Sequence, residues 1–487
     1  MTQDDDQLNI NFNESNPFQD ALAGGKFSVI VEVAPPLEGE GDSDNMFSLE
    51  KIAEECSRHE EIVGIAVSDR MQGPTHMPAW KLAQRLSKIS TKPAISHISG
   101  QGHDQESFEE EVAAASSAGI NNLLLISGTL QEGEDKYFES TEQLRNCTAK
   151  HENINTGAAV NPFKYSVNSS FAQYLKMIQK ISSGAKFITT QAGLDMRKYD
   201  ELLRFCTHRE ITVPLIARLN LISHDCLPMI TDLQMEPGVP LSREISSLVL
   251  RELNEAQDHS SFMNIQLRRL CLQINACALM GYSGVQIKGI KNAVELHQVM
   301  IRMRACMEEI ISLEQFYQEW DALNQSVSFS PGSSIVQSLP NQDLKSSNHA
   351  QTGTYYIYKK SELRPVDESL SSDNTDDLIY ADFNHPSEFE VFRTKLAKKL
   401  NLDEKDGSIA RLLKKTITGI SDDSPADLAK TQFTDLSACP KKLIHGCCGG
   451  TRSDDLCEDG KSSCIHLARI GMAASLNQLD LLEQPSD

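Results

Sequence analysis

The sequence lacks any long apolar run. None of its 487 residues belongs to a stretch of 18 or more consecutive apolar residues, and the first 20 residues are acidic, without an apolar centre. A membrane-spanning helix needs about 20 apolar residues, and a secretory signal needs an apolar core, so neither is expected. We therefore predict a cytoplasmic protein with no membrane span.

Basic residues are scarce relative to acidic ones. The chain has 46 Lys and Arg against 68 Asp and Glu, which gives a formal net charge of −22. Such a balance excludes a nucleic-acid backbone or an anionic membrane as the main partner. A hydrophobic content of 40% with 23% charged residues is typical of a folded globular protein.

The glycine-rich GxGxxG turn of dinucleotide-binding folds is also missing, since Ala34-Pro35-Pro36 follows the first apolar run. Between residues 26 and 290, short β-branched runs alternate with helical patterns, which predicts parallel strands joined by helices. The eight runs are 27–33, 63–67, 93–97, 122–126, 157–160, 186–190, 213–219 and 284–287. Eight such units over roughly 270 residues favour an α/β fold of the (β/α)8 TIM-barrel type. An open, doubly wound sheet remains the alternative, because periodicity does not prove closure.

The composition changes after a helix predicted over 292–323. We expect a disordered acidic N-terminus over 1–25, the barrel over 26–325 and a polar linker rich in Ser, Asn, Asp, Gln and Pro over 326–375. A small helical and cysteine-rich module is then predicted over 376–487.

In a parallel barrel, chemistry collects where the strands end. Glu32 interrupts an apolar strand, where a buried carboxylate is costly and its pKa should rise, as suits a general acid. The alternative is a Glu32 paired with a neighbouring Arg or Lys. His97 also ends a strand, where a structural histidine is the alternative to a functional one. The other strand ends carry Ser68 with Asp69, Ser127-Gly128-Thr129, Asn161, Gln191 and Lys288.

The twelve cysteines fall into two groups. Seven are scattered over 56–306, in apolar contexts such as Cys271 and Cys277, and are expected to be small buried hydrophobes. Five lie between Cys439 and Cys464 among Gly, Ser and Asp, which favours a metal or cluster site. The predicted ligands are Cys439, Cys448, Cys457 and Cys464, with Cys447, His445 and His466 as substitutes. Their spacing leaves zinc and iron-sulfur both open, and a disulfide between the adjacent Cys447 and Cys448 would be strained.

The barrel region resembles the methylenetetrahydrofolate reductases. The matching stretches are VEVAPP (31–36), VSD around Ser68, SH at His97, AGINNLLLISG (118–128), NPFKY (161–165) and SSGAKFITTQAGLDMRKY (182–199). The C-terminal CPKKLIHGCCGG (439–450) is similar to a module that some relatives of these reductases carry and that is associated with iron-sulfur binding.

The resemblance implies an FAD-containing barrel that reduces 5,10-methylenetetrahydrofolate to 5-methyltetrahydrofolate in one-carbon and methionine metabolism. Glu32 would be the general acid, and Gln191 would contact the pterin and the nicotinamide. The flavin would be lined by Ser68, His97, Ser127, Gly128, Thr129, Asn161 and Lys180. The chain departs from the family at Thr129, where a carboxylate that stabilises the folate cation is usual.

Two functional hypotheses follow. In the first, the protein is an oxidoreductase that receives electrons from NAD(P)H or through a cluster in the C-terminal module. In the second, it is a non-catalytic folate-binding or iron-sulfur electron-transfer subunit of a one-carbon complex. A third interpretation concerns the cysteines alone, which would hold a structural zinc. Folate, an electron-transfer protein and further copies of the chain are the expected partners.

Overall fold

The computed structural model describes residues 16–38, 44–69, 76–331, 386–402, 413, 415–418, 431–452 and 455–483. The expected disorder of residues 1–15, most of the expected linker and much of the segment after residue 402 lie outside the described residues.

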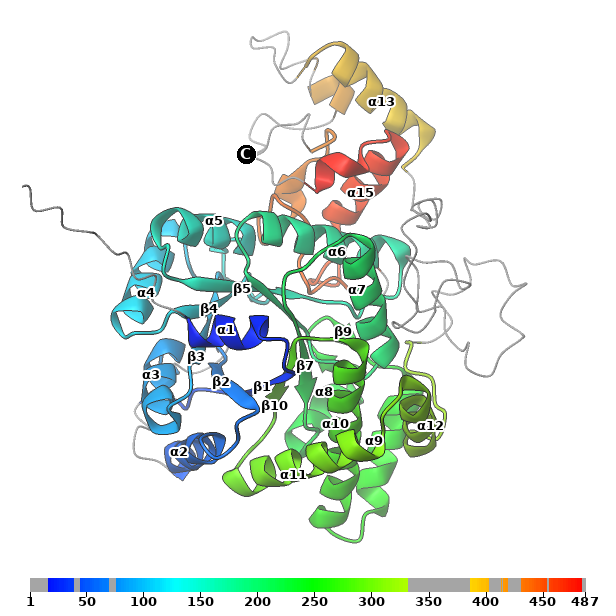
Figure 1. The fold of residues 1–487 in the computed structure, drawn as a ribbon. Helices are drawn as coiled ribbons and strands as arrows, with labels where there is room; N and C mark the ends of the chain where they lie inside the picture. The colour runs from blue at the N-terminus through cyan, green and yellow to red at the C-terminus, as the bar shows by residue number, and fades with distance from the viewer. Residues whose placement is uncertain are drawn as a thin grey trace, which may run out of the picture.

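Eight parallel strands close into a barrel, as predicted (Figure 1). They are β1 (Ser28–Val33), β2 (Ile62–Val67), β3 (Ala94–Ser99), β4 (Asn122–Ile126), β5 (Asn155–Val160), β6 (Phe187–Thr190), β7 (Leu215–Asn220) and β10 (Gly284–Lys288). Their order around the barrel is β1, β10, β7, β6, β5, β4, β3, β2, and β1 pairs with β10 to close the ring. This closure excludes the open doubly wound sheet.

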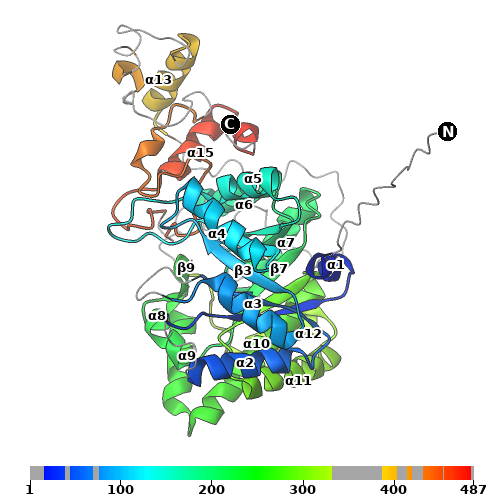
Figure 2. The same cartoon turned by 90° about the vertical axis from the view of Figure 1, so that its left-hand side faces the viewer.

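Helices surround the barrel on the outside (Figure 2). They are α2 (Asp44–Cys56), α3 (Ala79–Ser90), α4 (Gln105–Ser117), α5 (Ser140–Lys150), α6 (Val167–Ser182), α7 (Met196–His208), α8 (Leu227–Thr231), α9 (Arg243–Glu255), α10 (His259–Met280), α11 (Ala293–Glu309) and α12 (Leu313–Leu323). A short hairpin of β8 (Gln234–Glu236) and β9 (Val239–Pro240) follows α8. Most of these helices begin at a side-chain cap, for example Asp104 at α4 and Asn292 at α11.

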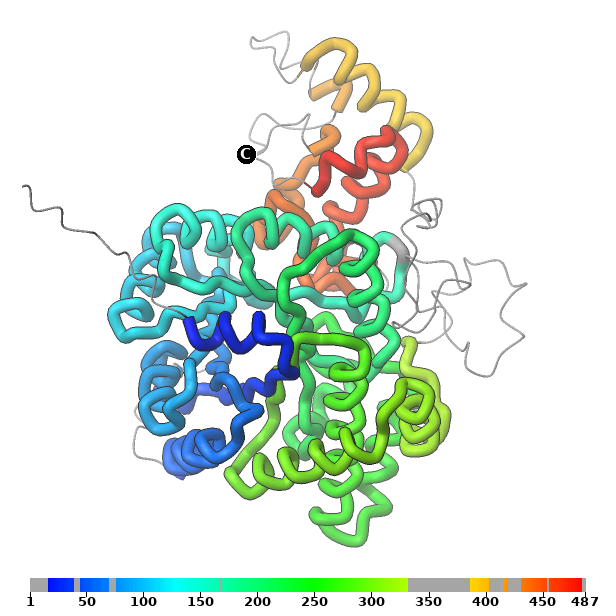
Figure 3. The backbone as a smooth tube through the Cα atoms, in the orientation of Figure 1, coloured from blue at the N-terminus to red at the C-terminus, as the bar shows by residue number. Residues whose placement is uncertain are grey.

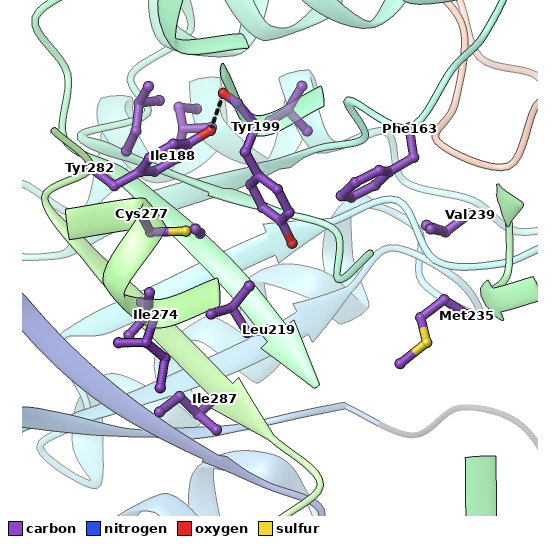
Figure 4. Close-up of a cluster of buried hydrophobic side chains, with 14 of the residues drawn as sticks. Phe163, Ile188, Tyr199, Leu219, Met235, Val239, Ile274, Cys277, Tyr282 and Ile287 are labelled. Carbon is purple, nitrogen blue, oxygen red and sulfur yellow. Dashed lines mark hydrogen bonds between the residues drawn. The ribbon is translucent and has the colours of Figure 1, made fainter. Parts of the chain in front are cut away.

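The alternation of side chains along each strand divides the apolar core into two layers. Residues such as Val29 and Val31 of β1 pack outward against the helices, whereas Ile30 points into the barrel with Phe187 and Ile216. Figure 4 shows part of the outer layer, where Tyr199, Cys277 and Tyr282 pack together and the Tyr282 hydroxyl donates 2.8 Å to the Tyr199 carbonyl. Cys271 and Cys277 are buried apolar residues, as expected.

The N-terminal prediction is wrong for part of its range. Helix α1 (Pro17–Ala23) is capped by Asn16 and buries Phe18 and Leu22 in the inner layer, with the Phe18 ring edge-on to Phe187 at 5.4 Å between centroids. Apolar burial of this kind stabilises the helix even though it is short. The helix predicted over 292–323 is two helices, because Ile310 is extended and Ser312 caps α12.

The described residues of the C-terminal module include α13 (Glu388–Lys399), two 3-10 turns (Leu436–Ala438 and Leu479–Leu482) and α15 (Ile465–Ser475), with the cysteine loops between the first of these turns and α15. The tube in Figure 3 follows this segment from α13 down to the barrel at α5 and α6. Helix α15 packs on α6, and Leu467 and Ile470 join the outer core layer. In the described part of the chain, no helix combines the length and the apolar character needed to cross a membrane.

Candidate active site at the barrel mouth

Four charged side chains meet where β1, β7, β8 and β10 end. The Arg218 guanidinium donates to both oxygens of Glu32, at 2.6 Å from Nε and 2.5 Å from Nη2. Its Nη1 donates 2.9 Å to Glu236, which is also bound by Lys288. Gln286 donates 2.7 Å to Glu32 as well. The two carboxylates, Glu32 and Glu236, are thus balanced by two cations, Arg218 and Lys288, and these four residues are called the charged set below.

The electrostatics of Glu32 differ from the sequence expectation. Burial alone would raise the pKa of this carboxyl, but Arg218 outweighs the burial and holds the pKa well below its usual range. Glu32 is therefore the paired carboxylate of the alternative interpretation, and it is ionised at neutral pH. Burial lowers the pKa of His97 to about 4, so this ring is neutral, with Nε2 3.4 Å from Gln286.

A cavity of about 410 Å³ opens beside this charged set, at the ends of β3 to β6. Of the nine barrel residues predicted to act, six line it: Ser127, Gly128, Thr129, Asn161, Lys180 and Gln191. The other three, Glu32, Ser68 and His97, are not among the described residues that line it. Ser68 instead donates 3.3 Å to the Val33 carbonyl. Asp69, Gln101 and Lys176 line the cavity in addition.

Two of these lining residues show why the local sequence suits a ligand site. Gly128 has a φ of +77° and a Cβ there would lie 2.4 Å from the Ser99 hydroxyl, so glycine is needed after β4. Lys180 on α6 donates 2.6 Å to the Ala159 carbonyl, and burial lowers the pKa of its ammonium to about 7.

The cysteine module supplies the remaining wall of the cavity. Leu443, the segment 447–450 and Glu458 line it together with the barrel residues. Asn161 donates 2.7 Å to the Gly449 carbonyl, and the buried ammonium of Lys164 donates to the carbonyls of Gly449 (2.9 Å) and Thr451. The module is therefore held against the mouth by hydrogen bonds from β5 and the loop after it.

Two carboxylates strengthen this attachment. Glu139, before α5, accepts the backbone N–H groups of Ile444 (2.8 Å) and His445 and is paired with Lys176. Glu458 accepts the N–H of Leu130 at 2.9 Å and is paired with Lys441, which donates 2.8 Å to the Gly128 carbonyl. Both ends of the loop after β4 are thus bound by the module.

The five C-terminal cysteines are only partly brought together. Cys464 donates a hydrogen bond to Cys447, which lowers the pKa of the Cys447 thiol, and the ammonium of Lys164 lies near Cys447, Cys448 and Cys464. Within the described residues, the predicted quartet of Cys439, Cys448, Cys457 and Cys464 does not form a group whose ligand atoms all lie within 4.8 Å of one another. Cys447, predicted only as a substitute, thus lies against the predicted ligand Cys464.

The two substitute histidines have different surroundings. His445 is bonded to Glu142 through Nε2. His466 is buried, and within the described residues neither of its ring nitrogens has a hydrogen-bond partner. Soft thiols beside the buried ammonium of Lys164 are chemically suited to a thiolate-bound metal.

Several site residues escaped the sequence analysis. Arg218 is a charged residue within the apolar run 213–219, just as Glu32 is within its own strand. Two opposite charges in buried strands could have predicted an ion pair between them. Lys164 and Glu458 carry no local signal, because their roles depend on contacts between segments far apart in sequence. The same holds for a cluster outside the mouth, formed by Glu55 of α2, His59 just after it and His297 of α11, in which the Glu55 carboxylate is 3.0 and 2.8 Å from ring nitrogens of the two histidines.

A closed (β/α)8 barrel with a cavity at the carboxyl ends of its strands is the architecture of a barrel enzyme or ligand-binding protein. The family model of the methylenetetrahydrofolate reductases matches residues 17–236, from α1 to β8. This part of the barrel is thus similar to the methylenetetrahydrofolate reductases, and the match supports a folate-related function.

Two solved structures are similar to the chain. An uncharacterized protein from Clostridium thermocellum, described as binding two copies of 5-methyl-5,6,7,8-tetrahydrofolic acid, is 15% identical with a TM-score of 0.47 and covers 61% of this chain and 100% of its own. The homocysteine methyltransferase MmuM from Escherichia coli is 8% identical with a TM-score of 0.34, and the match covers 59% and 100% of the two chains. A search of curated proteins found no match.

Proposed function

We propose that the protein reduces 5,10-methylenetetrahydrofolate to 5-methyltetrahydrofolate at the mouth cavity, with a bound flavin and with electrons that enter through a metal group on the C-terminal cysteines. One observation carries the proposal. Six residues that the family resemblance assigns to flavin and substrate line the same cavity as Cys447 and Cys448. A redox group on those thiols would border the flavin, so no long transfer path is needed.

The residues of the cavity fit a flavin. Ser127 and Thr129 offer hydroxyls, Gly128 allows close approach of a ligand to the backbone, and the ammonium of Lys180 can meet a phosphate. Gln191, just after β6, can hydrogen-bond a pterin. A flavin bound there would supply the hydride that the methylene carbon receives, while the chain orients the folate and closes the site with the segment 447–450.

The thiols fit an electron-carrying group. Cys447, Cys448 and Cys464 would be its nearest ligands, with Cys439 and Cys457 as the further thiols of the module. Lys164, buried among the first three, would balance the negative charge of thiolate ligands. Zinc at the same thiols would clamp the module to the barrel without redox chemistry, and NAD(P)H would then be the direct donor.

An anaerobic UV-visible spectrum of the full-length protein tests the proposal. We expect a two-banded flavin spectrum with an added broad iron-sulfur shoulder. The flavin bands should bleach with NADH or a low-potential reductant and recover when 5,10-methylenetetrahydrofolate is added. A protein that binds no flavin even after incubation with FAD, or whose reduced flavin is not reoxidised by the folate, would contradict the proposal.

A second function, a folate-binding or electron-transfer subunit without catalysis, is favoured by the charged set. Glu32 at the family's general-acid position is ionised by its pairing with Arg218, and Thr129 replaces the usual carboxylate. Tight folate binding by a protein without reductase turnover would favour this function over the first.

A further inference from the structure

The proposed reduction needs a proton at the mouth cavity, and the inference below rests on that function. Opening the five-membered ring of the folate requires a proton on its N10 nitrogen. Glu32 is poorly suited to give it, because both of its oxygens accept from Arg218 and one accepts from Gln286 as well. It is also not among the described residues that line the cavity.

Among the described residues, two carboxyl groups line the cavity, those of Asp69 and Glu458. Glu458 is engaged in attaching the module, since it accepts from Leu130 and is paired with Lys441. Asp69, two residues past β2, accepts a hydrogen bond of 2.8 Å at its Oδ2 from the Ser99 N–H. That bond fixes the side chain at the wall between β2 and β3, where Asp69 lines the cavity.

We propose that Asp69 is the catalytic residue that protonates the folate. Its carboxyl proton passes to N10, and the bond between N10 and the bridging carbon breaks with its electron pair left on N10. The lone pair of N5 forms a double bond to the same carbon, which gives the iminium that accepts hydride. Asp69 is left as a carboxylate, and the solvent at the open mouth restores its proton.

The surroundings of Asp69 favour the protonated form. Burial raises the pKa of its carboxyl to about 6, against the effect of the Ser99 hydrogen bond. Glu111 on α4 raises the pKa further, and His103 in the loop before α4 opposes it. Across the cavity lie Lys176 and Lys180 of α6 and the ion pair of Lys441 and Glu458. A carboxyl with a pKa near 6 can hold and release a proton close to neutral pH.

Asp69→Asn separates catalysis from structure, because the amide oxygen can still accept from Ser99 N–H but the side chain has no acidic proton. We expect thermal unfolding, flavin content and folate affinity within about twofold of wild type, and a loss of about 100-fold or more in the rate at which the folate reoxidises the reduced protein. Glu109→Gln is the matched control, because this partly exposed carboxyl of α4 is paired with Lys150 and is not among the described residues that line the cavity; it should change none of these.

The pH dependence of the reoxidation rate distinguishes a catalytic Asp69 from a structural one, because a structural role would not change the pH at which the rate falls. In the wild type, the reoxidation rate should be highest below pH 6 and fall about tenfold per pH unit above it. Glu111→Gln should shift this fall to lower pH, because it removes a charge that raises the pKa of Asp69, and this test holds even if Asp69→Asn does not fold.

The outcomes are distinct. An active wild type with an equally active Asp69→Asn variant, or with a pH profile that Glu111→Gln does not move, would overturn the role of Asp69 alone. A wild type that binds no flavin or reduces no folate would overturn the proposed function, and the role of Asp69 with it.

Discussion

Among the groups that attach the cysteine module to the barrel, the buried carboxylate of Glu139 binds residues of both parts. It accepts the N–H groups of Ile444 and His445 from the module and binds Lys176 from α6. Burial alone would raise the pKa of Glu139. Lys176, together with His445 and the Ile444 N–H of the module, outweighs the burial and lowers this pKa to about 2. The negative charge of Glu139 thus stabilises the contact between the cysteine module and helix α6.

The magnitude follows from that pKa. A carboxyl whose pKa falls from 4.5 to about 2 on folding adds about 3 kcal/mol to the free energy of unfolding, at about 1.4 kcal/mol per pH unit. Because the folded pKa is the lower one, the stabilisation is complete above about pH 4.5 and is lost as the pH falls towards 2. Glu139→Gln removes the charge at every pH and leaves the Lys176 ammonium buried without its anion.

We expect Glu139→Gln to lower the free energy of unfolding of the module by about 3 kcal/mol at pH 7, measured by urea denaturation, and to expose the segment 431–483 to limited proteolysis. The difference from wild type should shrink as the pH is lowered from 4.5. The partly exposed Glu109→Gln should change the stability much less. If the Glu139 variant is as stable and as protease-resistant as wild type at pH 7, the electrostatic account of the attachment is refuted.

Three further predictions concern the interior, the cavity and the thiols. Glu32→Gln should lower the free energy of unfolding by about 3 kcal/mol, because Glu236 is then the one carboxylate left to balance both Arg218 and Lys288. A thermal midpoint equal to that of wild type would contradict the stabilisation by these ion pairs. Gly128→Ala should weaken flavin binding about tenfold or more, because its Cβ would meet Ser99 and Gln101 and its φ is +77°; flavin titration with wild-type affinity would argue against a ligand at this loop. Cys447→Ser should lose most of the bound metal on anaerobic purification while Cys147→Ser, in the buried core of the barrel, keeps it; equal metal contents would exclude Cys447 as a ligand.

The sequence by itself determined the barrel. All eight predicted runs are strands, because a parallel strand covered on both faces must be apolar along its whole length, and that pattern is visible locally. The same local rule identified Glu32, since a charge in such a run stands out. Helix α1 was missed because it has only seven residues, too few to show a helical period, and the burial of Phe18 and Leu22 in the barrel stabilises it.

Only the tertiary structure decided what the site residues do. The pKa of Glu32 depends on Arg218, which lies 186 residues away in sequence. Burial raises the pKa of this carboxyl, whereas Arg218 lowers it. Similarly, the cavity is closed by a loop more than 250 residues beyond Gln191, held by Lys164, Glu139 and Glu458. Local patterns carry backbone preference and burial, whereas charge balance is set by distances between atoms from different segments, and these exist only once the chain has folded.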